Sequence, residues 1–167
     1  ESSVMSLEVC IGEERNIFEE SPKHADRLIL NSPILTRQTF EAIVNNDLKD
    51  YSNDRIDLNY DFTIDLEEAI NTISDRAVRS VKKGNNLIIL SDKQINKDKL
   101  VIPAPMAVGA VHHKLIAEGL RCDTNIIVET GSARNPHHFA VLIGYGATAI
   151  YPYLTFEVIR ELSERKV

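Results

Sequence analysis

The sequence predicts an α/β fold in which a parallel sheet is built from repeated strand–helix units. Short apolar runs recur from residue 56 onward, and segments of helical period separate them. Parallel strands need crossover connections, which helices usually supply. We therefore expect one domain over 1–167, in which residues 1–55 form an irregular N-terminal part and residues 56–167 form repeated βα units.

The first unit pairs a strand at 56–60 with the clearest helix of the chain. Asp65 is suited to cap a helix that begins at Leu66, and Gly84 follows the expected helix end. One apolar stripe runs along this helix, formed by Leu66, Ala69, Ile70, Ile73, Ala77, Val78 and Val81.

The later units repeat the pattern along the rest of the chain. The continuous apolar run at 87–90 is typical of a strand covered on both faces. We expect further strands at 125–128 and 147–150, and helices over 105–118, from 135 to 144 and from a cap at Thr155 onward. In the N-terminal part only 25–30 resembles a helix. Four units cannot close an eight-stranded barrel, so the sheet is either open and doubly wound or part of an incomplete TIM-like barrel.

Composition and charge exclude several classes of protein. The chain has 43% hydrophobic and 26% charged residues, which is typical of a globular protein. Its formal net charge of -6 argues against a nucleic-acid partner. No apolar run approaches the roughly 18 residues that span a bilayer, so we expect no membrane partner. The chain starts without methionine and stops inside a charged helical pattern, so we expect a segment excised from a longer protein.

The cysteines and histidines provide no obvious metal site. Cys10 and Cys122 are the only cysteines, and they form no CxxC pair, which favours a reducing, cytoplasmic location. The histidines form two adjacent pairs, His112-His113 and His137-His138. Helix chelation uses residues three or four apart, so neither pair chelates a metal by itself. A site would need the two helices to converge, and the alternative is that these histidines pack and hydrogen-bond.

The loop from Glu129 to Pro136 is the best candidate for a functional contact. It follows an expected strand and leads into a helix N-terminus, a position where anions bind in parallel α/β proteins. Arg134 could hold a carboxylate or phosphate there, or it could pair with an acidic neighbour in an ordinary βα loop. We name Arg134, Glu129, His137 and His138 as candidate interdomain or anion contacts.

Motifs of catalysis are missing from the sequence. No serine lies in a GxSxG motif, no Walker sequence is present, and neither cysteine has a base motif around it. We therefore assign no catalytic, cofactor-binding or metal residue and expect the isolated segment to be non-catalytic.

The same residues resemble a known family, the central domain of the large (alpha) subunit of glutamate synthase. The resemblance covers nearly the whole chain, and its densest blocks are Ile89–Asp92, Ile102–Ala104, Ala110–Arg121, Val128–Gly131, His137–Ala147 and Pro152–Leu154. A third histidine usually follows the first pair in this family, and here Lys114 stands instead. Lys93 and Ser132 stand where arginine and glutamate are usual.

The resemblance implies a place between an N-terminal glutaminase domain and a C-terminal synthase domain that binds FMN and an iron-sulfur (3Fe-4S) cluster. The parent makes two glutamates from glutamine, 2-oxoglutarate and a reductant, which makes it an oxidoreductase of nitrogen assimilation. The central domain is implied to be a rudimentary relative of the flavin barrel, to help enclose the ammonia channel and to hold no cofactor itself. The alternative is a free-standing small α/β enzyme or anion-binding protein that uses Arg134, His137 and His138.

Overall fold

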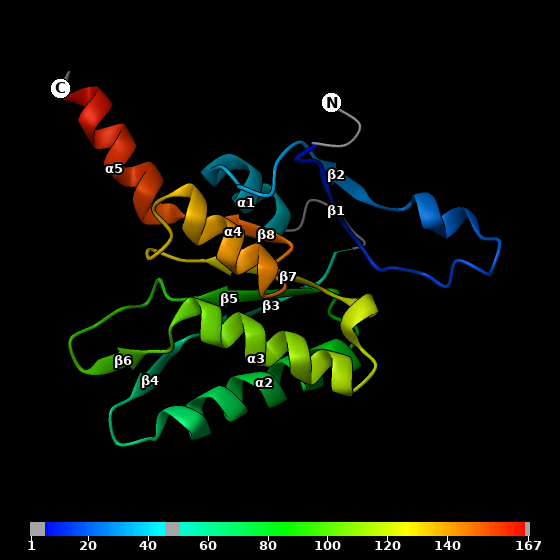
Figure 1. The fold of residues 1–167 in the computed structure, drawn as a ribbon, viewed down its shortest axis with the longest axis horizontal. Helices are drawn as coiled ribbons and strands as arrows, with labels where there is room; N and C mark the ends of the chain where they lie inside the picture. The colour runs from blue at the N-terminus through cyan, green and yellow to red at the C-terminus, as the bar shows by residue number, and fades with distance from the viewer. Residues whose placement is uncertain (1–5, 46–50, 166–167) are drawn as a thin grey trace.

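The computed structural model describes residues 6–45 and 51–165 of the chain. At its centre is a four-stranded parallel sheet (Figure 1). Its strands are β3 (Asn53–Asp57), β5 (Leu87–Ser91), β7 (Asn125–Glu129) and β8 (Ala149–Tyr151). The helices after these strands are α2 (Leu66–Lys82), α3 (Ala104–Ala117), α4 (Pro136–Gly144) and α5 (Tyr153–Glu164).

The order of the strands identifies the type of sheet. Their spatial order, β3-β5-β7-β8, is also their order along the chain. A doubly wound sheet reverses its strand order at a switch point, whereas a βα barrel adds each strand beside the previous one. The described residues form no closed barrel. The expected parallel sheet of βα units, with an incomplete barrel-like arrangement, is therefore confirmed.

One face of the sheet packs against helices α2, α3 and α4. Alternate strand residues point to this side, including Ile88, Leu90, Ile126, Val128 and Ile150. Figure 1 shows α2 and α3 below the sheet, seen edge-on, and α4 beside β7 and β8. All five residues of β5 and of β7 are buried, so these two central strands are covered on both faces, as expected for β5 from its apolar run.

The N-terminal part covers the opposite face. It contains β1 (Val9–Ile11), the 3-10 helix η1 (Pro22–Ala25), β2 (Leu28–Leu30) and α1 (Arg37–Val44). Its apolar side chains enclose the other alternate strand residues in a second core, whose buried members are Ile11, Leu30, Leu35, Phe40, Ile43, Tyr51, Leu87, Ile89, Ile127, Ala149 and Tyr151. The rings of Phe40 and Tyr151 stack with centroids 4.5 Å apart.

A short extended segment joins this N-terminal part to the sheet. The backbone N of Ile150 donates to Pro33 O at 2.7 Å, and the backbone N of Leu35 donates to Ile150 O at 2.8 Å. Ile34 thus forms a parallel bridge with Ile150. The residues before α1 therefore extend the sheet beyond its last strand.

Most predicted helix boundaries are confirmed by their caps. The Asp65 carboxylate accepts from the backbone N of Glu67 at 3.1 Å, and the Asn135 side chain accepts from the backbone N of His138 at 3.0 Å. Gly84 and Gly119 follow α2 and α3 with φ of 96° and 70°, the left-handed conformation in which glycine is favoured.

Four expectations differ from the structure. The strand expected at 56–60 is divided between β3 and β4 (Asn59–Asp61), and β4 pairs antiparallel with β6 (Lys99–Val101). Residues expected to be irregular form β1, β2 and α1, and 25–30 ends in strand β2 where a helix was expected. Pro152 and not Thr155 precedes α5, and Thr155 lies inside the helix, where its hydroxyl donates to Ala133 O at 2.7 Å.

The loop before β8 is fixed by a close backbone approach. Gly146 has a φ of 112°, and a Cβ atom added to it would lie 2.4 Å from His112 Nδ1. Arg121 holds both sides together, since its Nε donates to His112 Nδ1 at 3.0 Å and its Nη2 donates to Gly146 O at 3.0 Å. Only glycine satisfies both the conformation and the space at this position.

We therefore expect Gly146→Ala to lower the free energy of unfolding by about 2–3 kcal/mol, because it combines a strained φ with a steric clash. Gly144→Ala is the matched control, since a Cβ there has no neighbour within 4 Å. Urea unfolding followed by circular dichroism measures both variants. Equal stabilities of the two variants would contradict this account of Gly146.

Candidate functional site

The carboxyl ends of the parallel strands bring several charged side chains together around Glu129, the last residue of β7. Glu129 is fully buried, and its Oε2 accepts from Ser91 Oγ at 2.6 Å. Arg55, from β3, forms an ion pair with the same oxygen. Glu129 Oε1 accepts no hydrogen bond from the described residues and lies 3.6 Å from Lys93 Nζ. One buried carboxylate thus connects three neighbouring strands.

A second carboxylate, that of Asp92, organises the loop after β7. It accepts from Thr130 Oγ1 at 2.5 Å and from the backbone N of Gly131 at 3.0 Å. The pKa of Tyr153 is raised above its ordinary value by burial and by the adjacent Asp92 carboxylate, to which Tyr153 is hydrogen-bonded. Gly131 leaves room for this tyrosine, since a Cβ on it would lie 2.9 Å from Tyr153 Oη. The loop is therefore tightly held.

Two residues at which the family resemblance led us to expect other side chains lie in these networks. Lys93, where we expected arginine, lies 3.6 Å from Glu129 Oε1, and its Nζ lies 5.7 Å from the centroid of the Tyr153 ring. Ser132, where we expected glutamate, shares a hydrogen bond with Thr130 at 2.8 Å. Lys93 thus keeps a positive charge beside the Glu129 carboxylate.

The four candidate contact residues do not converge on one site. The Glu129 carboxylate is fully buried, and its Oε2 is bound by Ser91 and Arg55, so a ligand cannot reach it from the surface. Arg134 is exposed and lines a groove of about 470 Å³ along α5, together with Leu154, Thr155, Val158 and Ile159. None of the ion pairs among residues 6–45 and 51–165 includes Arg134.

The second histidine pair lines a different groove. His137 and His138 face the start of α3 across a space of about 430 Å³, whose lining also includes Pro103, Ala104 and Pro105. His138 Nδ1 accepts from the backbone N of Arg134 at 3.2 Å, which assigns that ring nitrogen a structural role. His137 and the Arg134 side chain thus line separate grooves.

The first histidine pair has a structural role at His112, which packs under Gly146 and accepts from Arg121. Burial, with smaller contributions from the Arg121 and His113 charges, lowers the pKa of His112 below its ordinary value of 6.5. His113 is exposed on α3. The packing interpretation of the histidines therefore applies to His112.

The positions of the His, Cys, Asp and Glu side chains determine whether the chain could hold a metal ion or an iron-sulfur cluster. In the described part of the chain no three His, Cys, Asp or Glu side chains lie close enough to hold a metal ion. Iron-sulfur clusters are held by several cysteine thiolates, whereas this sequence has two cysteines, both exposed. These residues do not fit a 3Fe-4S cluster.

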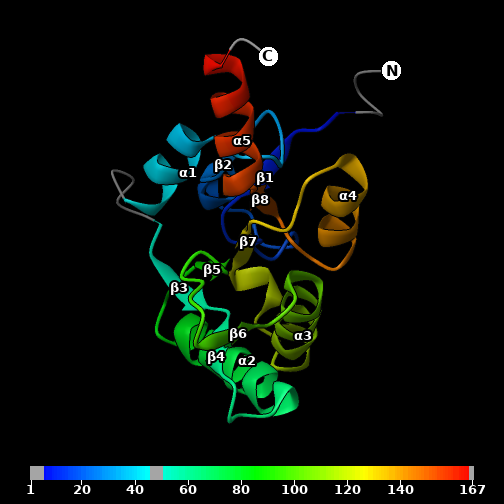
Figure 2. The same ribbon diagram turned by 90° about the vertical axis from the view of Figure 1, so that its left-hand side faces the viewer.

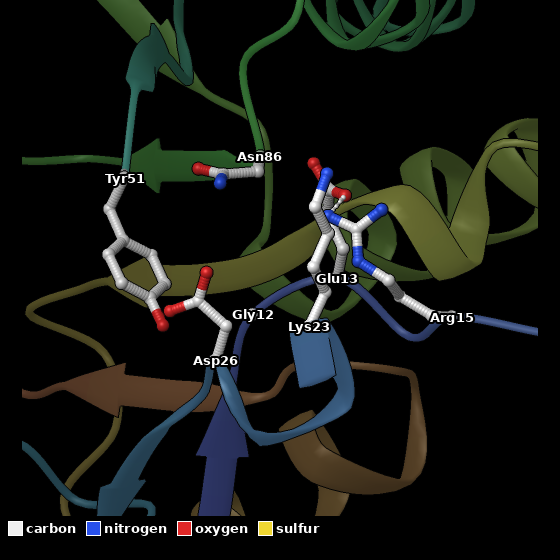
Figure 3. A pocket seen from close by; sticks show the side chains of 7 residues that line it. All are labelled: Gly12, Glu13, Arg15, Lys23, Asp26, Tyr51 and Asn86. Carbon is white, nitrogen blue, oxygen red and sulfur yellow. Dashed lines mark ion pairs between the residues drawn. The ribbon is translucent and has the colours of Figure 1, made fainter. Parts of the chain in front are cut away.

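A polar pocket that the sequence did not reveal lies at the amino ends of the strands (Figure 3). Its volume is about 270 Å³, and its lining residues are Gly12, Glu13, Arg15, Lys23, Asp26, Tyr51 and Asn86. Arg15 pairs with Glu13 at 2.8 Å, and Tyr51 Oη donates to Ile11 O at 3.1 Å. Its charges are balanced, two cations against two carboxylates. No local motif predicts the pocket, because its residues come from segments far apart in the sequence.

The fold and these networks define an α/β domain built on part of a βα barrel, with a tightly hydrogen-bonded carboxyl edge. The chain matches the family model "Glutamate synthase central domain" over residues 1–167. It is 40% identical over 162 residues to a ferredoxin-dependent glutamate synthase of Pyropia yezoensis and 39% identical over 164 residues to a glutamate synthase [NADPH] large chain of Bacillus subtilis. The chain belongs to the glutamate synthase central domain family.

The chain spans only part of its relatives. Each of the two alignments covers 96% of this chain and 10% of the relative. A glutamate synthase [NADH] of Saccharomyces cerevisiae is 35% identical over 95% of this chain and 8% of its own length.

None of the helices in the described part of the chain combines the length and the hydrophobicity of a membrane-spanning segment.

Replacement of the central carboxylate tests its structural importance. We expect Glu129→Gln to lower the free energy of unfolding by about 2 kcal/mol, because it removes the buried partner of Arg55 while Arg55, 39% exposed, can still reach water. Glu118→Gln, which breaks the surface pair with Lys82, is the control and should have a much smaller effect. Urea unfolding compares them, and similar losses would show that burial of the Glu129 pair has no special effect.

The lowered pKa of His112 predicts a pH dependence of stability. The unfolded chain binds this proton more readily than the folded chain, so the stabilisation is complete above the unfolded pKa of 6.5 and is lost as pH falls through the lower folded pKa. His112→Asn keeps an acceptor for Arg121 but does not titrate. Its free energy of unfolding should fall less than that of the wild type between about pH 7.5 and pH 5.5. Parallel pH profiles would contradict this assignment.

Proposed function

We propose that this chain is the connecting domain of a glutamate synthase, linking a glutaminase domain to an FMN-binding synthase domain of the same polypeptide. The observation that carries the proposal is the match of the whole chain to one domain type, combined with relatives about ten times as long. The parent reaction would form two glutamates from glutamine, 2-oxoglutarate and a reductant. In this proposal the FMN and the iron-sulfur cluster belong to the synthase domain.

The proposed contribution of this chain is to enclose the path of ammonia between the two active sites. Ammonia that reaches bulk water becomes ammonium and is lost to the reaction, so the path needs walls that exclude water. Rigid walls suit this task, and the domain is rigid where it is best packed. Strands β5 and β7 are buried on both faces, and Glu129 and Asp92 tie their carboxyl ends together.

Arg134 is the proposed contact between this domain and its neighbour. It is exposed and follows a loop held by Asp92, so its backbone is fixed while its guanidinium remains available. A guanidinium of this kind binds a carboxylate or backbone oxygens of a neighbouring domain. The alternative, one ligand site formed by Arg134, His137 and His138, requires side chains that line two separate grooves to converge.

We also propose a reducing, cytoplasmic location, on the basis of the two free, exposed cysteines.

The proposal predicts a specific defect in the full-length enzyme. Arg134→Ala should leave glutaminase competence and flavin content near normal while raising the ammonia released per glutamate formed, because a loosened interface affects coupling more than chemistry. The measurement is the ratio of ammonia to glutamate at matched folding stability. Arg79→Ala, at an exposed arginine of α2, is the control and should leave the ratio at the wild-type value.

The possible outcomes separate the roles of Arg134. An unchanged ratio would reduce it to an ordinary surface arginine, and loss of flavin would assign it to cofactor support.

A further inference from the structure

The first half of helix α5 packs against the rest of the described chain. Tyr153 and Phe156 pack against the second core, and Glu157 lies 3.6 Å from Arg37. No residue of α5 is buried. Both ribbon views show the helix extending away from the sheet (Figures 1 and 2).

Helix α5 is amphipathic, and its apolar face is about half exposed among the described residues. Four large apolar side chains, 45–56% exposed, lie at positions i, i+4, i+5 and i+8 and so share one face; they are Leu154, Val158, Ile159 and Leu162, which we call the α5 stripe. Charged side chains elsewhere on the helix pair with one another, Arg160 with Glu157 and Arg165 with Glu161. Such a division is typical of a helix that has protein on one side and water on the other.

The helix also lacks the packing that normally stabilises an element of its length. It has 12 residues, and isolated helices of this length are marginal in water because most helical stability comes from tertiary packing. None of its residues is buried by the described part of the chain, and its second half, which carries Ile159 and Leu162, is exposed throughout. A surface that covers the α5 stripe would supply this packing.

The groove beside the stripe indicates the chemistry of that surface. Leu154, Val158 and Ile159 form its apolar part, and Arg134 also lines it. Arg134 is exposed and has no carboxylate partner among the described residues. A matching surface would therefore present apolar side chains together with a carboxylate.

We propose that the α5 stripe and Arg134 form an interdomain docking surface, and that its occupant is another domain of the same glutamate synthase polypeptide. This inference rests on the proposed function, in which the chain is one domain of a longer protein. The relatives devote about nine-tenths of their length to other segments, so a covalently attached occupant is available.

The size of the surface favours an attached partner over a second copy of the chain. A stable complex between separate proteins usually buries about 800 Å² on each partner, which four half-exposed side chains and one arginine do not supply. A domain on the same polypeptide is present at an effective concentration of about millimolar, so a small apolar surface is sufficient to hold it.

Photo-crosslinking in the full-length glutamate synthase identifies the occupant. A benzophenone amino acid in place of Leu162 should crosslink within one polypeptide to a peptide outside residues 1–167. The same amino acid in place of Ile116, which is 51% exposed on α3, is the control and should not crosslink to that peptide. Crosslinks between two polypeptides, crosslinks confined to residues 1–167, or no crosslinks would each overturn the proposal.

Hydrogen exchange of the full-length enzyme provides a second, independent measurement. Amides in the second half of α5 should exchange slowly in the wild type and at least about tenfold faster in Ile159→Glu, which places a charge in the docked face. Ile116→Glu is the matched control, because it changes the same residue type at a similar exposure in another helix, α3. It should leave the exchange of α5 unchanged. Fast exchange in the wild-type enzyme would overturn the docking of α5.

The two experiments distinguish this inference from the proposed function. If Arg134→Ala changes the ratio of ammonia to glutamate but α5 forms no crosslink outside 1–167, the docking surface is wrong and the coupling role is supported. If the crosslink forms and the ratio does not change, docking of the α5 stripe is supported and the coupling role of Arg134 is wrong.

Discussion

Burial of the second face of the parallel sheet is the constraint on which the rest of this structure depends. Strands β5 and β7 are apolar on both sides, and the crossover helices cover only one. In a closed βα barrel the opposite strands fill the interior. Here β1, β2 and α1 take that place, and Phe40 stacks on Tyr151 where a further strand would otherwise contribute side chains. The N-terminal part is therefore as necessary to the core as the helices, although the sequence gives it little regular pattern.

That contrast explains which elements could be predicted from the sequence. The helices α2, α3 and α4 have local signals, and all three were predicted close to their true bounds. Helix α2 has an apolar period, the capping side chain of Asp65 and a glycine after its end, α3 is followed by Gly119, and α4 is capped by Asn135. Strands β1, β2, β4 and β6 have three residues each, too few to show a period of two, and each is defined by a partner distant in sequence. Their hydrogen bonds depend on tertiary structure, so local propensity could not reveal them.

The candidate functional residues were predictable only in part, for a similar physical reason. The loop after β7 was recognisable because it joins a strand to a capped helix, and the structure places it at the carboxyl edge of the sheet, as that pattern indicates. The enclosure of the Glu129 carboxylate by protein could not be predicted, because its partners Arg55 and Ser91 come from other strands, 74 and 38 positions away. A carboxylate at a strand end has the same local sequence whether it faces a ligand or is enclosed by protein. Enclosure by two cations and a hydroxyl makes Glu129 part of the framework.

The distribution of exposed apolar side chains fits the proposed linking role better than it fits a free-standing enzyme. They include the α5 stripe and, in the loop between β1 and β2, Ile17 and Phe18, which are 83% and 90% exposed, and others such as Phe62 and Ile95 lie elsewhere on the surface. Within that loop the Asn16 side chain accepts from the backbone N of Phe18 at 3.1 Å and donates to Glu19 at 3.1 Å. Figure 1 shows the loop and α5 at opposite ends of the long axis. A small enzyme concentrates its apolar surface around one ligand cleft, whereas a connecting domain needs adhesive surfaces at separated places joined by a rigid body. The sheet that is covered on both faces supplies that body, because its second core joins α5, through Tyr153 and Phe156, to the strands β1 and β2 that flank the loop.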